Sequence, residues 1–437
     1  MLPKDGKRRL SRQLLLLLPL FLTTAWAQDP PREWIDPDTG HRIVRLSDEP
    51  GSSSFYFHQN RYTASGDKMV FSTRQGLSVL EFKTHKITSL VQGRTRNEIV
   101  GKNTRQVFYM REDTVYATNI DTGETRTIVK EPALLTSAGF AVNANETLLA
   151  GSMTEGQGEP SPAPSPAASS SPEAKPEATP STPRNVAQEG NDNPPGKGVM
   201  MERRLAAHIP MALFTINIKT GEVKTFNHCT DWMNHVQFSP TDPDLIMFAH
   251  EGPWHKVDRI WTIHTDGTGL RKMHTRTMDM EIAGHEFFNP DGKIIWYDLQ
   301  TPKSKVFWLG GVEVATGKTI RYSLQKSEWS VHFNVAPDGK LFAGDGGGPN
   351  SVAAPDNGQW IYLFTPKNGE FKAEKLVNLA KHDYRLEPNV TFTPDEKWIV
   401  FRSNMHGPTQ IYAVEVRKAK NGLKAKDGVK SGASGSK

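Results

Sequence analysis

The chain has 437 residues, 36% of them hydrophobic, and a formal net charge of +5 at pH 7. This length exceeds that of a small domain and suits one large repeat fold with tails. Much of the positive excess lies at the two ends of the chain, which leaves the central part near neutral and argues against a nucleic-acid partner.

The N-terminus has the features of a secretory signal peptide. A basic stretch precedes an apolar run over 14–22, and Ala-Trp-Ala at 25–27 is a small-x-small cleavage site. We therefore expect a signal peptide over 1–27 and no membrane partner after its cleavage; an uncleaved anchor is the alternative, although the run is short for a membrane span. Cys229 is the single cysteine, so no intrachain disulfide forms, and we expect a secreted or periplasmic bacterial protein.

A turn pattern recurs through the rest of the chain. An apolar strand runs into a turn proline, usually followed by Asp, and a second strand follows. The prolines of the clear copies are Pro240, Pro290, Pro337 and Pro394. Such turns join antiparallel strands, and a spacing of roughly 40 to 50 residues is typical of one propeller blade. Weaker copies upstream extend the period, so the sequence predicts an all-β fold, a seven-bladed β-propeller over 28–417.

Two segments fall outside this period. Residues 156–198 are rich in Pro, Ser, Ala and Glu, and such a composition cannot bury enough apolar surface to fold. We expect a disordered insert there, between two blades. We also expect a disordered basic tail over 418–437, and we assign no chemistry to either segment.

One position of the repeat carries polar side chains in four successive blades. The first strand of each blade lines the central channel of a propeller. Counting five residues back from each turn proline gives His235, His285, His332 and Asn389. This pattern predicts a ring of imidazole and amide groups around one pocket, which is typical of metal and acid–base sites. The alternative is that these side chains satisfy buried backbone groups in a crowded channel.

Several segments resemble those of the oligogalacturonate lyases, polysaccharide lyase family 22. The similarity is carried by Asn-His-Val-Gln-Phe-Ser-Pro at 234–240, His-Glu-Gly-Pro-Trp-His at 250–255 and Gly-His-Glu-Phe at 284–287. The resemblance implies a metal-dependent lyase that cleaves oligogalacturonate, the short fragments of pectin, by β-elimination. A non-catalytic, TolB-like periplasmic binding propeller is the alternative.

The same resemblance implies roles for individual residues. His235 matches the proposed catalytic base of the family, and His285 matches a ligand of its divalent metal, typically manganese. The other family ligands lie in a Gln-x-x-His-Pro-His segment, where this chain has Tyr384 for Gln and Glu387 and Asn389 for two His. A metal site of His285, Glu387 and Asn389 would favour Mn²⁺, or else Ca²⁺, over softer metals.

The implied substrate is an acidic oligosaccharide, so basic and imidazole groups near the site are candidates for binding it. Arg385 is expected to grip a substrate carboxylate bidentately. The position of the family's catalytic arginine holds no arginine here, and His208 lies nearby. His250 and His332 are rivals of His235 as base, or else substrate contacts. The expected substrate-binding residues are therefore His208, His250, His332 and Arg385, and the oligomeric state stays open.

Overall fold

The computed structural model describes residues 31–156, 197–348 and 359–419. The predicted signal peptide lies outside these residues, as do most of the predicted insert and tail. The last two residues of the predicted insert belong instead to a helix, α1 (Lys197–Ala207), and the final strand extends to Lys418. In the part of the chain that is described, no helix has the length and apolar character needed to cross a membrane.

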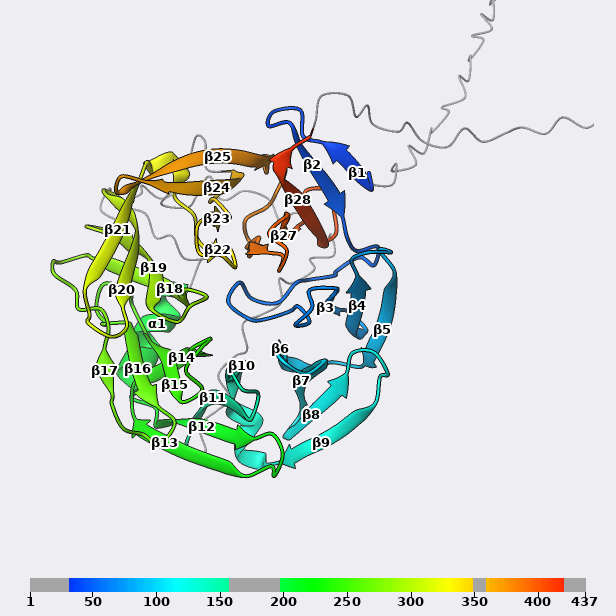
Figure 1. Cartoon of the computed structure of the whole chain (residues 1–437). Helices are drawn as coiled ribbons and strands as arrows, with labels where there is room; N and C mark the ends of the chain where they lie inside the picture. Colours follow the sequence, from blue (N-terminus) through cyan, green and yellow to red (C-terminus); the bar gives the residue numbers. More distant parts are fainter. Residues whose placement is uncertain (1–30, 157–196, 349–358, 420–437) are drawn as a thin grey trace, which may run out of the picture. The chain divides into compact units, whose positions relative to one another are not determined.

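Antiparallel sheets follow one another along the chain and are arranged around a centre (Figure 1). A three-stranded sheet contains β3 (Lys68–Thr73), β4 (Gly76–Glu81) and β5 (Ile87–Gln92). Three four-stranded sheets follow: β6 (Arg96–Val100), β7 (Gln106–Arg111), β8 (Thr114–Asn119) and β9 (Thr125–Lys130); β10 (Ala138–Val142), β11 (Leu148–Thr154), β12 (Met211–Asn217) and β13 (Val223–Cys229); β14 (Trp232–Phe238), β15 (Leu245–Glu251), β16 (Ile260–His264) and β17 (Arg271–Lys272). Two short 3-10 helices cover Pro132–Thr136 and Lys326–Glu328.

The next sheet has eight strands but consists of two antiparallel groups. One group is β18 (Ile282–Phe288), β19 (Ile294–Gln300), β20 (Phe307–Glu313) and β21 (Thr319–Leu324), and the other is β22 (Phe333–Val335), β23 (Phe342–Gly344), β24 (Trp360–Lys367) and β25 (Glu370–Asn378). A single parallel bridge between Ser323 and Glu370 joins the two groups. The described chain is thus nearly all β-structure, as the sequence predicts.

Apolar strands pack against both neighbouring sheets, and this explains their continuous hydrophobic runs. On β3, Met69 and Phe71 pack in one core cluster with Val400, whereas Val70 points the other way and packs with Val107. Successive side chains of a strand point to opposite faces, so each sheet is buried on two sides.

The two ends of the described chain meet in one sheet. This five-stranded sheet has the order β1 (Glu33–Ile35), β2 (His41–Arg45), β28 (Gln410–Lys418), β27 (Trp398–Ser403) and β26 (Thr391–Phe392). Ile43 on β2 pairs with Val414 on β28, and both are fully buried in a core cluster with Ile399. Pairing of β2 with β28 closes the series of sheets.

Ile43→Ala tests how much this closure contributes to stability. Because Ile43 is fully buried, we expect a loss of about 2 to 5 kcal/mol in the free energy of unfolding, measured by urea denaturation. Leu135→Ala removes an apolar side chain that is 51% exposed, and it should cost about 0.5 kcal/mol or less. Equal effects of the two substitutions would contradict a tightly packed closing sheet.

Candidate functional site

A repeated bulge in the inner strands orients the predicted site residues. The strand register shifts between Asn234 and Gln237 in β14–β15 and between Gly284 and Phe287 in β18–β19. The backbone φ is +50° at His235, +47° at His285 and +55° at Asn389, which lies just before β26. This left-handed conformation is uncommon outside glycine, and bulges often redirect a side chain. The predicted repeat position is therefore also a repeated backbone conformation at these three residues.

The structure brings the predicted imidazoles together with His58 and Tyr56, which are not among the predicted site residues. The ring centroids of His285 and His332 are 4.6 Å apart, and His58 lies 5.7 Å from His235. Tyr56 joins the two pairs, with its ring centroid 5.4 Å from that of His235 and 5.2 Å from that of His332. The Tyr56 hydroxyl is also 3.2 Å from His332 Nε2. We call these five residues the imidazole cluster.

Each predicted ring histidine has an acidic partner. His285 Nδ1 is 2.9 Å from Asp298 Oδ1, and His332 Nδ1 is 2.8 Å from Asp345 Oδ2. His235 Nε2 lies 3.3 Å from a Glu251 carboxylate oxygen. Carboxylates in such positions fix the orientation and tautomer of an imidazole and stabilise its protonated form. Sequence reasoning missed these partners, although Asp298 and Asp345 both follow their histidine by 13 residues.

A buried network of ion pairs contains Glu251, the carboxylate partner of His235. Arg259 is 2% exposed, and its guanidinium lies 2.7 Å from Glu251 Oε1 and 3.2 Å from Glu286 Oε2. Burial by itself would raise the pKa of Glu251, but Arg259 and His235 hold that pKa well below its ordinary value. Glu251 therefore remains ionised and keeps a negative charge beside His235.

The pKa values of other titratable groups in the cluster and beside it shift in opposite directions. Burial lowers the pKa of His58 well below its ordinary value, and the nearby His235 and His332 lower it further. Burial also opposes protonation of His332, but Asp345 and Glu387 outweigh it and raise the pKa of His332. Burial raises the pKa of Asp298 to about 7. Neutral and protonated imidazoles side by side are suited to acid–base chemistry.

The expected substrate-binding residues separate into two groups. His332 lies in the cluster, whereas the structure places the other three outside it. Arg385 has an 85% exposed side chain, and its Nε donates to Asp383 at 2.8 Å. His250 precedes Glu251 on β15, so it faces the other side of the strand, and it lies 3.3 Å from Asp231. His208 is exposed just after α1.

The expected metal ligands also differ in their surroundings. Asn389 is fully buried; its Oδ1 accepts from the Phe57 N–H at 3.1 Å, and its Nδ2 donates to the Glu387 carbonyl. This amide therefore holds the Tyr56–His58 segment in place. The Glu387 carboxylate lies 3.7 Å from His332 Nε2. Among the described residues, no group of three or more His, Cys, Asp or Glu side chains is arranged to hold a metal ion.

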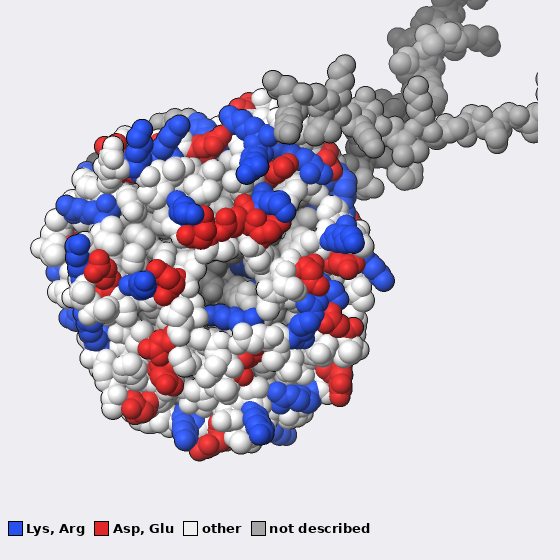
Figure 2. All heavy atoms as spheres, in the orientation of Figure 1, with Lys and Arg blue, Asp and Glu red and all other residues white. Residues whose placement is uncertain are grey.

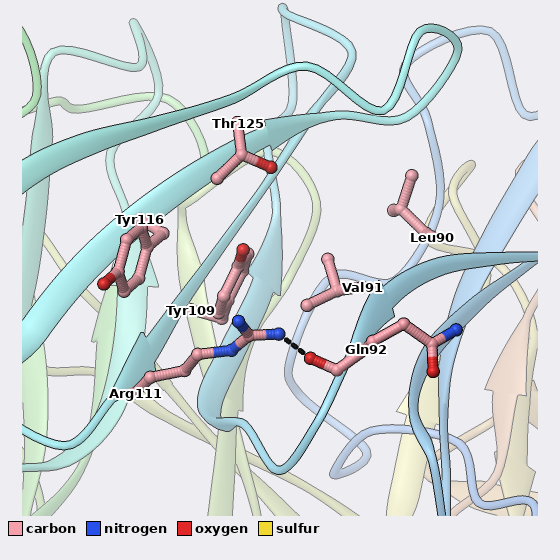
Figure 3. Close-up of a pocket in the computed structure, with 7 residues that line it drawn as sticks. All are labelled: Leu90, Val91, Gln92, Tyr109, Arg111, Tyr116 and Thr125. Carbon is pink, nitrogen blue, oxygen red and sulfur yellow. Dashed lines mark hydrogen bonds between the residues drawn. The ribbon is translucent and has the colours of Figure 1, made fainter.

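A hollow opens at the centre of the face seen in Figure 2, with Lys or Arg atoms inside it. A second hollow, of about 290 Å³, lies among β5, β7, β8 and β9. There Tyr109 and Tyr116 stack with centroids 5.6 Å apart, and Arg111 donates to the Gln92 carbonyl (Figure 3). It has no imidazole or carboxylate in its lining, so the imidazole cluster remains the candidate site.

Comparison with solved structures defines the class of protein as a β-propeller. An oligogalacturonate lyase from Vibrio parahaemolyticus superposes with a TM-score of 0.71 at 21% identity, over 88% of this chain and 96% of that chain. An oligogalacturonate lyase in complex with manganese gives 0.70 at 23% identity, with the same coverage. The β-propeller domain of Cps50 (Swd1) from Myceliophteria thermophila gives 0.50 at 11% identity, over 86% of this chain and 100% of that chain.

Sequence comparison points to one family within that class. The family model for oligogalacturonate lyase matches residues 205–420. The oligogalacturonate lyase of Dickeya dadantii is 30% identical over 221 residues, and the oligogalacturonide lyase of Pectobacterium atrosepticum is 28% identical over 221 residues. Each match covers 47% of this chain and 55% of the relative, so the chain spans about half the length of the curated relatives it matches. The predicted resemblance to the oligogalacturonate lyases is thereby confirmed.

His382 provides a pH test of the segment that carries Glu387. It is buried, with Nδ1 2.9 Å from Ser403 Oγ and Nε2 2.6 Å from the Leu386 carbonyl, and burial lowers its pKa to about 4. In the unfolded chain its pKa is about 6.5, so the unfolded state binds more protons between these two values. This contribution to stability is therefore present above the unfolded pKa and is lost on acidification.

We expect the stability advantage of the wild type over His382→Gln to shrink between about pH 7 and about pH 4.5. Urea denaturation of both proteins at the two pH values measures this difference. An advantage that is the same at both would show that His382 does not resist protonation in the folded state.

Proposed function

We propose that this protein is a lyase that cleaves oligogalacturonate by metal-assisted β-elimination and releases unsaturated uronates. The observation that carries the proposal is the imidazole cluster, in which His235, His285 and His332 each have a carboxylate partner. All three lie within residues 205–420, the part of the chain that matches the family model.

We further propose that the sheets are seven blades. Division of the eight-stranded sheet at its single bridge gives β18–β21 and β22–β25 as separate blades. The propeller would span 28–417, with 156–198 as an insertion between β11 and β12 and 1–27 as an export signal. A secreted or periplasmic location follows from that signal and would give the protein access to pectin fragments.

The negatively charged side chains around the imidazole cluster favour binding of a divalent cation. The carboxyl groups around it belong to Glu251, Glu286, Asp298, Asp345 and Glu387. Glu286 Oε1 and Asp298 Oδ2 are buried without a hydrogen-bond partner. An acidic sugar that enters such surroundings needs additional positive charge nearby. One solved relative of the same fold holds manganese, and mixed imidazole and carboxylate ligands suit Mn²⁺.

His285 and Glu387 are the residues that would hold this ion. His285 has its Nδ1 on Asp298, and a carboxylate on one imidazole nitrogen is the arrangement typical of a metal-ligating histidine. Asn389 already accepts a hydrogen bond from Phe57, so we assign it the support of the site. A bound metal would act as a Lewis acid toward the substrate carboxylate and so favour loss of the neighbouring C5 proton.

His235 is suited to remove that proton. His235 Nε2 lies beside Glu251, and Nδ1 would accept the C5 proton. The electron pair of the C5–H bond would form the C4=C5 double bond as the C4–O bond breaks, and the departing sugar oxygen would take up a proton from water or from the His235 imidazolium. The imidazolium that forms is stabilised by Glu251, which Arg259 keeps ionised. The residues at 251 and 259 thus act through His235 and position it.

Replacement of the proposed base tests this assignment. His235→Ala should lower turnover of digalacturonate by about 10²- to 10⁴-fold, because a general base contributes that much. His250→Ala is the matched control from the neighbouring strand and should keep near-normal turnover, because it faces away from the cluster. If His250→Ala loses activity and His235→Ala does not, the base is misassigned. If turnover is unchanged in both variants and in His332→Ala, a binding propeller becomes the better account.

Metal content tests the other half of the proposal. Protein loaded with Mn²⁺ and freed of excess ion should retain it, and His285→Ala should lose it because the main nitrogen ligand is gone. His228→Ala is the control, since His228 is exposed and pairs with Glu155 instead. Full retention of manganese by His285→Ala would place the ligands elsewhere.

A further inference from the structure

One buried and one half-buried arginine lie beside the imidazole cluster, where the segment 53–61 runs past β27. Arg402 on β27 donates from Nε to the Glu387 carbonyl at 2.7 Å and from Nη1 to Ser53 Oγ at 2.9 Å. Arg61 is fully buried and donates from Nη2 to the Tyr56 carbonyl at 2.9 Å. The same short segment therefore holds both guanidinium groups.

Neither arginine forms an ion pair with a carboxylate of the residues that the structure describes. In the described part of the chain, the ion pairs within 4.0 Å include none made by Arg61 or Arg402, whereas Arg259 contacts two carboxylates. Arg61 Nε and Nη1 are also buried without a hydrogen-bond partner. The charges of Glu387 and Asp345 act on Arg402 from beyond ion-pair distance, whereas no carboxylate among the described residues offsets the charge of Arg61. A buried guanidinium without a counter-charge is costly, and a carboxylate is the anion that its geometry fits.

The pair of arginines adjoins the proposed catalytic residues. Arg402 contacts the backbone of Glu387, whose carboxylate is 3.7 Å from His332 Nε2. Arg61 contacts the backbone of Tyr56, whose hydroxyl is 3.2 Å from the same nitrogen. A sugar ring bound at the imidazole cluster would therefore place the next ring of the oligosaccharide within reach of Arg61 and Arg402. We call this pair of arginines the seam.

We propose that this seam is a carboxylate subsite for the uronate adjacent to the one that loses its C5 proton. Arg402 would contact that carboxylate directly through the side of its guanidinium that Ser53 and Glu387 do not use. Arg61, which is fully buried, would act as a positioning charge behind it. This inference rests on the proposed function. It gives Arg402 the role that the sequence suggested for Arg385, whose guanidinium is exposed and bound to Asp383.

The subsite predicts selectivity between a free acid and its methyl ester. The probes are digalacturonate and digalacturonate esterified on its non-reducing ring, the ring adjacent to the reacting one. Calorimetry with Mn²⁺-loaded His235→Ala protein measures binding without cleavage. We expect the acid to bind at least about tenfold more tightly than the ester, because a hydrogen-bonded charge pair is lost with the ester.

Arg402→Gln in the same background should abolish this preference. Affinity for the acid should fall about 10- to 100-fold, and affinity for the ester should stay unchanged. Arg126→Gln removes an exposed arginine of the outer strand β9 and should leave both affinities intact. Arg402→Lys keeps the charge without the planar fork and should show a smaller preference for the acid. If Arg402→Gln has a lower melting temperature than the parent protein, the comparison rests on Arg402→Lys instead.

The outcomes separate the subsite from the function. Arg402 variants that keep the full preference for the acid overturn the subsite and leave the lyase proposal standing. Equal losses for acid and ester show a purely structural role for Arg402 and also overturn it. If the His235→Ala protein binds neither probe while its melting temperature matches the wild type, the proposed function itself fails, and the subsite fails with it.

Discussion

The left-handed backbone conformation at His235, His285 and Asn389 decides what this molecule presents at its centre. Each of these residues precedes or interrupts an inner strand, where regular pairing would otherwise set the direction of the side chain. The conformation is uncommon for residues with a Cβ atom, although His and Asn adopt it more readily than most. At His235 and His285 the shift of strand register within β14–β15 and β18–β19 accompanies this conformation.

Charge is the second organising feature of the site. Arg259 is neutralised by Glu251 and Glu286 on one side. Beside the Tyr56 segment, Arg61 and Arg402 form no ion pair with any carboxylate of the described residues. The first arrangement keeps a carboxylate ionised next to His235. The second arrangement leaves the positive charge of Arg61 and Arg402 available to an anionic ligand. An acidic oligosaccharide with carboxylates on successive rings matches both arrangements, together with a divalent cation near His285.

The sequence alone predicts the architecture and the imidazole ring, because turn prolines mark the repeat and the histidines share one position within it. It fails where a side chain's partner comes from another part of the chain. The resemblance suggests Asn389 as a metal ligand, and no spacing in the sequence indicates that its amide accepts a hydrogen bond from Phe57, 332 residues away. Tyr56 and Arg61 precede the first clear repeat, and no spacing rule connects them with His332 or β27. The chemistry of Arg385 suits a substrate carboxylate, but the sequence does not indicate that its side chain is exposed and bonded to Asp383.

The central claim is that the imidazole cluster performs a metal-assisted β-elimination. The most direct measurement is the ultraviolet absorbance of the unsaturated uronate formed when the full-length protein acts on digalacturonate. The account predicts that absorbance rises, that a chelator stops the rise and that added Mn²⁺ restores it. Absence of any unsaturated product with Mn²⁺ present, or a rate that the chelator does not change, would contradict it.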